Sequence, residues 1–488
     1  MTTGTLRSNL IHYYWDIGWW GLYAGTLMPF LSVYAVRSGA TNEQLGLLTA
    51  APAAISLLLS LPVGRWARRF SPKRATVVSV ALQRGLMILF PLLPWILPPE
   101  AQVSGILVIT ALIAIPNTVT AISFNQLLMD AIPPEYRGLL VGNRIAIFSI
   151  LTFVVTLLAG FILDRMAGAA GYQVIFAIGF VGAIMTAYHL GRVNPLAGSP
   201  SAEAQPKPDK TARMLPSLDQ SGRYFVRIML LTFLLNTVNA LIVPLMPPFA
   251  VKTLLLSDQW IGIGAAINTF FVFLVSLGVA RLTRRTGNRR ATALGVAALA
   301  LSAVVLAFAQ DAALYLASMV VGGIAAGVLN TAQYNYVLDQ IPLQTRAAWF
   351  AVLALTGNAA ILIGSLGGPA LAGWISVPAI MLIVGGLRLL IGAAILLTDA
   401  DPRRWANFSL NLLGCPEMPV WAGAPLELRV VHPQCVQPGA SFQVTVPGTD
   451  GDPRIWATVC LTDDEGLFKL YYTGMEGKTA PRPRAGGR

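Results

Sequence analysis

Long apolar segments without a charged residue place the strongest constraint on how this chain can fold. A helix needs about 20 mostly apolar residues to cross the hydrocarbon core of a membrane. Uncharged stretches of that length recur along the chain, for example at 17–36, 101–129, 228–251 and 312–338. Only 11% of the residues are charged, whereas soluble domains usually have about 25%. The sequence therefore excludes an ordinary soluble enzyme and predicts a polytopic membrane protein.

The apolar pattern predicts twelve membrane-spanning helices. Their expected positions are roughly 10–36, 42–64, 75–97, 101–131, 137–164, 172–191, 223–251, 257–281, 291–310, 312–340, 346–373 and 377–398. The predicted fold class is all-α membrane, with twelve transmembrane helices and a small C-terminal β-rich soluble domain. We expect the protein to be embedded in the lipid bilayer as a monomer.

Residues 399–488 differ in composition from the rest of the chain. Alternating stretches with β-branched residues occur at 426–432, 441–446, 455–461 and 467–472, and turn-forming residues separate them. This pattern predicts a small β-rich domain followed by a disordered basic tail. Cys415, Cys435 and Cys460 lack the spacing of metal ligands, so we expect no metal and no cofactor.

Basic residues are distributed unequally between the two sets of predicted loops. One set carries 18 Lys and Arg residues, whereas the other carries only Arg37, Arg165 and Lys252. Cytoplasmic loops of membrane proteins carry an excess of Lys and Arg. The bias predicts a multi-pass protein of the cell membrane with cytoplasmic N- and C-termini. It also explains the net charge of +12 without a nucleic-acid partner.

Two sequence stretches recur in order along the chain. Residues 67–76 (ARRFSPKRAT) match residues 283–292 (TRRTGNRRAT) at five positions. Residues 130–137 (DAIPPEYR) similarly match residues 339–346 (DQIPLQTR). Such repeats predict two six-helix pseudo-repeat halves, at 1–191 and 223–398, joined by a flexible cytoplasmic linker at 192–222.

With these repeats, the chain resembles the major facilitator superfamily of secondary transporters. The resemblance covers residues 1–398 and includes the basic loop after the second span, in which Arg69, Lys73 and Arg74 match the family pattern. Arg68 stands where the family has an acidic residue. The resemblance implies that spans one, four, seven and ten line a central cavity for a small-molecule substrate.

Asp16 is the one acidic residue well inside a predicted span. His12, Asp16, Trp19 and Tyr23 share one face of the first helix. A carboxylate shielded from water can take up and release a proton, and aromatic rings can stack on a substrate. We therefore regard Asp16 as the candidate proton carrier, with Trp19 and Tyr23 beside it. The alternative is that Asp16 is hydrated, or paired with a loop arginine, near the cytoplasmic end of the helix.

Amide side chains form further polar stripes on the predicted cavity helices. Asn117 lies on span four, Asn236 and Asn239 on span seven, and Asn330 and Gln333 on span ten. A buried amide needs hydrogen-bond partners, which either a substrate or a neighbouring helix can supply. We expect substrate contact for the set as a whole. For Arg84 and Arg388, on spans three and twelve, a structural role is favoured.

Charged residues near the predicted cytoplasmic helix ends suggest a gate. Carboxylates at helix C-termini oppose the helix dipole and need basic partners. Arg68, Arg69 and Arg144 are the expected partners of Asp130, while the basic loops also hold their side of the protein in the cytoplasm. The full set of predicted gate residues is Arg68, Arg69, Asp130, Arg137, Arg144, Arg284, Arg285, Asp339 and Arg346.

These features predict a non-enzymatic secondary transporter of a small organic solute that works by alternating access. The sequence has no Gly-x-x-x-x-Gly-Lys-Ser nucleotide loop, which argues for a proton gradient as the energy source. The aromatic, nearly uncharged lining favours export of apolar compounds. A passive uniporter, an importer, and a non-transporting receptor that signals through residues 399–488 are the alternatives.

Overall fold

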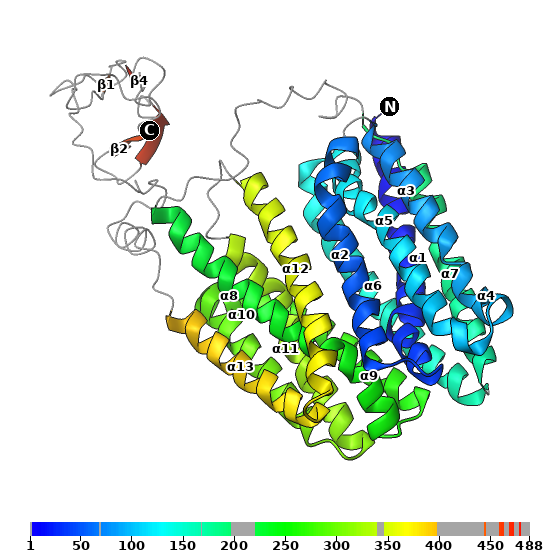
Figure 1. Ribbon diagram of the computed structural model, residues 1–488. Coiled ribbons are helices and arrows are strands. Elements are labelled where there is room, and N and C mark those ends of the chain that lie inside the picture. Colours follow the sequence, from blue (N-terminus) through cyan, green and yellow to red (C-terminus); the bar gives the residue numbers. More distant parts are fainter. Residues whose placement is uncertain are drawn as a thin grey trace. The chain divides into compact units, whose positions relative to one another are not determined.

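The computed structural model describes residues 2–67, 70–166, 168–196, 220–338 and 346–397, together with four short strands near the C-terminus. Contacts divide the chain into two units, Met1–Thr398 and Asp399–Arg488. The described part of the first unit is helical (Figure 1). It contains the predicted spans.

The first six predicted spans correspond to seven helices. These are α1 (Thr2–Arg37), α2 (Asn42–Ala67), α3 (Pro72–Leu86), α4 (Leu89–Ile96), α5 (Pro99–Ala131), α6 (Pro134–Arg165) and α7 (Ala169–Arg192). The third span is divided into α3 and α4 by a turn. Helices α3, α5 and α6 begin with proline, which fits the first turn because the missing N–H would have no partner inside the helix.

The seventh predicted span begins as a regular helix and ends irregularly. Helix α8 (Gln220–Ile242) is followed by the 3-10 turn η1 (Val243–Leu245), the short α9 (Met246–Pro248) and the π turn η2 (Phe249–Thr253). Pro244, Pro247 and Pro248 lie in this stretch. Each lacks the N–H that a continuing helix needs, which explains the break.

The eighth and ninth predicted spans are two helices, as expected, and they meet at a kink. They form one 50-residue element, α10 (Asp258–Ala307), which bends at Gly287. Gly287 has φ 78° and ψ 155°, a conformation open to glycine because it has no Cβ. The bend lies in the predicted basic loop, so α10 supplies two arms. Helices α11 (Ala312–Leu338), α12 (Arg346–Ala372) and α13 (Val377–Leu397) complete the half.

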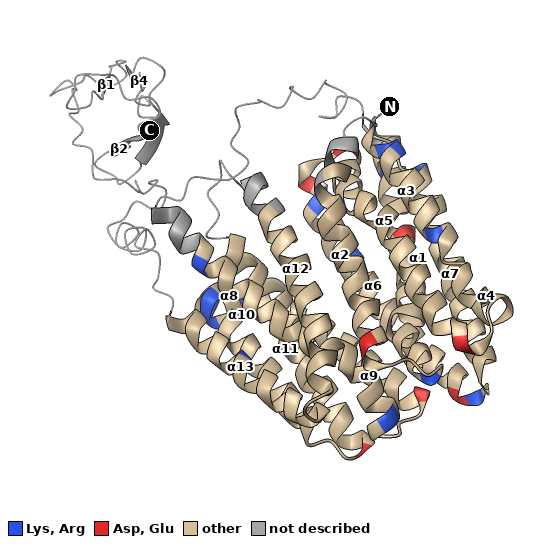
Figure 2. Cartoon of the chain, viewed as in Figure 1, with Lys and Arg blue, Asp and Glu red and all other residues tan. Residues whose placement is uncertain are grey.

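Among the described residues, ten helical segments are long and apolar enough to cross a membrane. This set counts α10 once and does not include α1. Helix α1 has 36 residues and is about 54 Å long at 1.5 Å per residue. Few charged residues lie between the helix ends (Figure 2). The chain is thus a helical multi-pass protein, and the count of twelve spans depends on α1 and on the two arms of α10.

The two halves follow the same packing scheme. Helix α1 packs on α6 and α7, and α8 packs in the same way on α12 and α13. Helices α2 and α3 pack on α5, and α10, which holds the two corresponding spans of the other half, packs on α11. The first span of each half therefore contacts the fifth and sixth, which agrees with the two-half organisation.

The halves meet through two equivalent helix pairs, α6 with α10 and α2 with α12. At the first pair, a Cβ added to Gly262 would lie 3.0 Å from the Cα atom of Gly160. At the second, a Cβ on Gly46 would lie 2.6 Å from the backbone oxygen of Ser365. Both contacts require glycine because the backbones approach so closely.

The second unit contains two antiparallel strand pairs. Strand β1 (Val444–Thr445) pairs with β4 (Lys478–Thr479), and β2 (Thr458–Thr462) pairs with β3 (Phe468–Tyr472). Strands β1 and β3 lie within two of the stretches expected to form strands, and β2 overlaps a third and extends one residue beyond it. Residues 426–432 lie outside the described residues. Strand β4 occupies the start of the tail that we expected to be disordered. These short pairs do not establish a β-rich domain, which stays a prediction.

Candidate functional site

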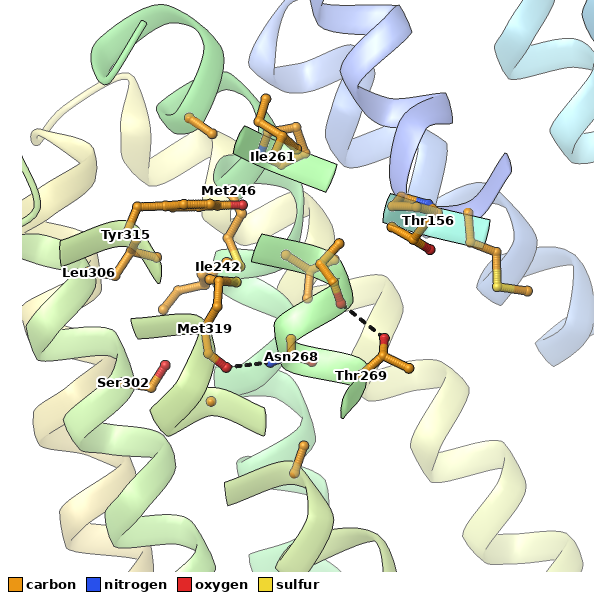
Figure 3. A pocket seen from close by; sticks show the side chains of 18 of the residues that line it. Thr156, Ile242, Met246, Ile261, Asn268, Thr269, Ser302, Leu306, Tyr315 and Met319 are labelled. Atoms are coloured by element: carbon orange, nitrogen blue, oxygen red, sulfur yellow. Dashed lines mark hydrogen bonds between the residues drawn. The ribbon is translucent and has the colours of Figure 1, made fainter. Parts of the chain in front are cut away.

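A cavity of about 610 Å³ lies between the two halves of the helical unit. The N-terminal half lines it with side chains of α1 and α6, including Met28 and Thr156, and the remaining walls come from α8, η1, α9, η2, α10, α11 and α13. Figure 3 shows side chains from several of these elements converging on the cavity. Its volume is within the range of about 300–1,000 Å³ found for small-molecule sites.

The walls of this cavity are mostly apolar, and several of its polar side chains are bonded to backbone. Asn268 Nδ2 donates to the oxygen of Met319 at 3.2 Å, and Thr269 Oγ1 donates to the oxygen of Ala265 at 3.0 Å (Figure 3). Ser302 Oγ donates to the oxygen of Ser318 at 2.9 Å. The cavity therefore suits a ligand that is apolar over most of its surface.

Arg388 of α13 also lines the cavity and is only 6% exposed. Its Nε donates to Asn239 Oδ1 at 2.9 Å, and its Nη1 donates to the oxygen of Leu299 at 2.9 Å. Both acceptors are neutral. Asn239, which we predicted to contact substrate, holds this guanidinium group and is not among the residues that line the cavity.

A smaller cavity of about 250 Å³ brings together three predicted amide residues. Asn236 of α8 lies there with Asn330 and Gln333 of α11, beside Thr232. The third helix with a predicted amide, α5, does not line this cavity. Asn117 of α5 is exposed and accepts a hydrogen bond from Gln83 Nε2 of α3 at 3.0 Å.

Asp16 forms a buried ion pair with Arg144, with a distance of 2.9 Å between Oδ2 and Nη1. The two side chains are 6% and 12% exposed, and Arg144 Nη1 also donates to the oxygen of Tyr13 at 2.7 Å. The expectation that Arg144 pairs with Asp130 is thus wrong. Helices α1 and α6 pack together, and this contact brings Arg144 to Asp16.

The aromatic neighbours of Asp16 contact other side chains of the N-terminal half. Trp19 stacks on Trp15 with a centroid distance of 6.4 Å, and Tyr23 stacks on Trp20 at 4.5 Å. Arg84 lies 3.9 Å above the Trp20 ring and its Nε donates to Thr186 Oγ1. Neither of the two cavities described above is lined by Asp16, Trp19 or Tyr23.

The predicted gate residues are only partly described. Asp130 is buried, and its Oδ2 has no hydrogen-bond partner among the described residues. Arg137 donates to the backbone oxygens of Met129 at 2.8 Å and Ile132 at 2.9 Å, so it caps the C-terminal end of α5. Arg284 and Arg285 are exposed on α10. Arg68, Arg69, Asp339 and the side chain of Arg346 lie outside the described residues.

Sequence reasoning missed a polar cluster between the halves. Arg37 at the end of α1 pairs with Asp258 at the start of α10 at 3.0 Å, and the Tyr172 hydroxyl of α7 donates to Asp258 Oδ2 at 2.6 Å. Nearby, Lys252 Nζ donates to the oxygen of Ala40 at 3.2 Å. The hydrogen bonds that join the halves within the described ranges all lie at this end. The sequence feature that could have predicted this cluster is that Arg37 and Lys252 are two of the three basic residues in the sparsely charged set of loops.

Groups of three or more His, Cys, Asp or Glu residues that could hold a metal ion do not occur in the described part of the chain. The candidate site consists of a mostly apolar cavity with a buried arginine, a separate amide cavity, and the Arg37–Asp258 cluster that joins the two halves.

The family model of the Major Facilitator Superfamily matches residues 20–227 and again residues 228–433. Each match begins near the start of one half. The chain belongs to the Major Facilitator Superfamily.

Solved structures of transporters share this fold. A D-xylose–proton symporter is similar with a TM-score of 0.65 and 15% identity, over 81% of this chain and 98% of that one. The nucleoside transporter NupG is similar with a TM-score of 0.57 and 15% identity, over 81% of this chain and 98% of that one. A bacterial homologue of the iron transporter ferroportin, in an inward-facing state, is similar with a TM-score of 0.60 and 13% identity, over 82% of this chain and 100% of that one. No curated protein sequence matches the chain significantly.

Proposed function

We propose that this protein is a secondary transporter that moves a small organic solute by alternating access. The observation that carries the proposal is the cavity of about 610 Å³ whose walls come from both halves. The two equivalent helix contacts, α6 with α10 and α2 with α12, give the halves a symmetric surface on which to rock. Transporters built from repeats bind substrate near the repeat interface in this way.

The charge bias of the loops supports cytoplasmic termini in the cell membrane. In that orientation, the Arg37–Asp258 cluster lies on the outer side. The described polar contacts between the halves gather there, and they support our proposal that this state is closed to the outside and faces inward.

For energy coupling, we propose that protons drive export and that Asp16 carries them. Asp16 is shielded from solvent and held by Arg144. Protonation of the carboxylate would remove its charge and release the arginine, which links proton uptake to the packing of α1 on α6. The apolar lining of the cavity supports substrates with a large apolar surface.

Proton movement in proteoliposomes tests this proposal. A panel of neutral, cationic and anionic aromatic solutes would be added to vesicles with the wild-type protein, Asp16→Asn, or Asp164→Asn as a control at an exposed acid of α6. Solute-dependent proton flux that only Asp16→Asn abolishes supports coupled transport. Solute flux without proton movement indicates a uniporter. Solute binding without flux contradicts transport and favours the receptor.

A further inference from the structure

Arg388 is a buried cation whose described partners carry no charge. It is 6% exposed, and the structure gives it the Asn239 amide oxygen and the Leu299 carbonyl oxygen as acceptors. Removing a guanidinium from water costs several kcal/mol unless an opposite charge compensates. Intramembrane arginines are accordingly rare and mark functional sites.

The described residues of the C-terminal half offer Arg388 no spare carboxylate. Residues 223–398 contain three acidic residues, Asp258, Asp311 and Asp339. Asp258 pairs with Arg37, and the exposed Asp311 accepts a hydrogen bond from the Leu314 N–H. Asp339 lies outside the described residues.

Two other arginines of the described residues that are largely shielded from solvent, Arg144 and Arg84, are compensated differently. Arg144 has the carboxylate of Asp16, and Arg84 lies over the electron-rich face of Trp20, where a cation–π contact stabilises the charge. Arg388 has neither kind of partner among the described side chains. It differs from Arg84 in a second way, because it lines the central cavity.

We propose that Arg388 is the receptor for an anionic group of the solute, and that the substrates of this cavity are organic anions with an apolar body and one carboxylate-like group. Asn239 and the Leu299 carbonyl fix the guanidinium, and the apolar walls take the body of the solute. The inference rests on the proposed transport function and names its substrate class. It replaces the structural role that the sequence favoured for Arg388.

A set of matched probes tests the charge preference directly. 2-Naphthoate, 2-naphthamide and 2-naphthylmethylammonium share one ring system and differ in charge. Their apparent affinities for the purified full-length protein follow from thermal unfolding at increasing probe concentration, since a ligand of the native state raises the unfolding temperature. We expect 2-naphthoate to bind at least about tenfold more tightly than the amide, because a charged hydrogen bond is lost in the amide, and we expect the ammonium probe to bind worst.

Variants then place the preference at Arg388. Arg388→Gln should bind 2-naphthoate and 2-naphthamide equally, Arg388→Lys should retain a weaker carboxylate preference, and Arg84→Gln should retain the full preference as the matched buried-arginine control. If Arg388→Gln does not fold, Asn239→Ala replaces it and should weaken carboxylate binding alone. A wild-type protein without carboxylate preference, or a preference that survives in Arg388→Gln, overturns the inference.

Binding and flux separate the two proposals. Charge-selective binding without naphthoate flux in proteoliposomes would end the transport proposal and leave the anion site standing. Flux of solutes regardless of charge, unchanged in Arg388→Gln, would end the anion site and leave transport standing.

Discussion

The ion pair between Asp16 and Arg144 joins α1 to α6 inside the N-terminal half. Removing only one partner leaves a buried, uncompensated charge, which typically costs about 3–5 kcal/mol. We expect Arg144→Gln to lower the free energy of unfolding by about that amount. The double variant Asp16→Asn with Arg144→Gln should recover most of it, because no charge remains buried. Denaturant unfolding of the purified protein measures both effects.

Arg165→Gln is the control for this prediction, because Arg165 is exposed at the end of α6. Its unfolding free energy should stay close to that of the wild type. A double variant less stable than Arg144→Gln would show that the pair does more than neutralise buried charge.

At the site, the sequence identified the notable residues but not their partners. Asp16 stood out because a carboxylate inside an apolar span is rare, but its partner depended on how α1 packs on α6. The amides at 236, 330 and 333 share a cavity, whereas Asn239 faces Arg388. Helical periodicity places such residues on a face of their own helix. It does not say which neighbour that face meets.

At the scale of elements, the Arg37–Asp258 pair connects the end of α1 to the start of α10. The Arg37 side chain is 38% exposed, so solvent weakens the pair, and exposed pairs contribute about 0–1 kcal/mol. We expect Arg37→Gln to shift the protein toward the outside-open state by up to about fivefold. Labelling of Thr269→Cys in the cavity by an impermeant thiol reagent, with Cys415, Cys435 and Cys460 replaced, measures the shift. An unchanged rate would contradict a gating role.

The glycine contact between α6 and α10 gives a second element-scale prediction. A leucine at Gly262 would press on Gly160 and on Phe30, whose Cζ atom lies 3.1 Å from the added Cβ. We therefore expect Gly262→Leu to separate the two helices and reduce solute flux severalfold. Gly278→Leu on the same helix is the control, because no atom lies within 4 Å of its added Cβ. Equal flux in the two variants would contradict a role for this contact in transport.

At the scale of the whole molecule, the apolar stretches predicted most of the spanning helices and the two-half organisation. Their lengths follow from the thickness of the membrane, and the repeat follows from the loop motifs. The kink at Gly287 separates the eighth and ninth spans inside the basic stretch where the sequence predicted a loop. The broken end of the seventh span was missed although Pro244, Pro247 and Pro248 marked it.

The second unit should be dispensable for transport. The cavity and both helix contacts between the halves lie within Met1–Thr398. We expect a protein that lacks residues 405–488 to retain solute flux in proteoliposomes within about twofold of the full-length chain. Equal amounts of folded protein, checked by size-exclusion chromatography, provide the control. Loss of flux with binding preserved would instead assign the unit a direct part in the function.

The walls of the central cavity are unequal in chemistry. Asn268, Thr269, Ser302 and Arg388 all belong to the C-terminal half, while α1 and α6 add mainly apolar side chains with Thr152 and Thr156. A solute bound there would make its polar contacts mainly with the C-terminal half, and the N-terminal half would contact it mainly through apolar side chains. Rocking would then exchange mostly apolar contacts between the solute and α1 and α6, so the change between the two open states would break few polar contacts with the solute.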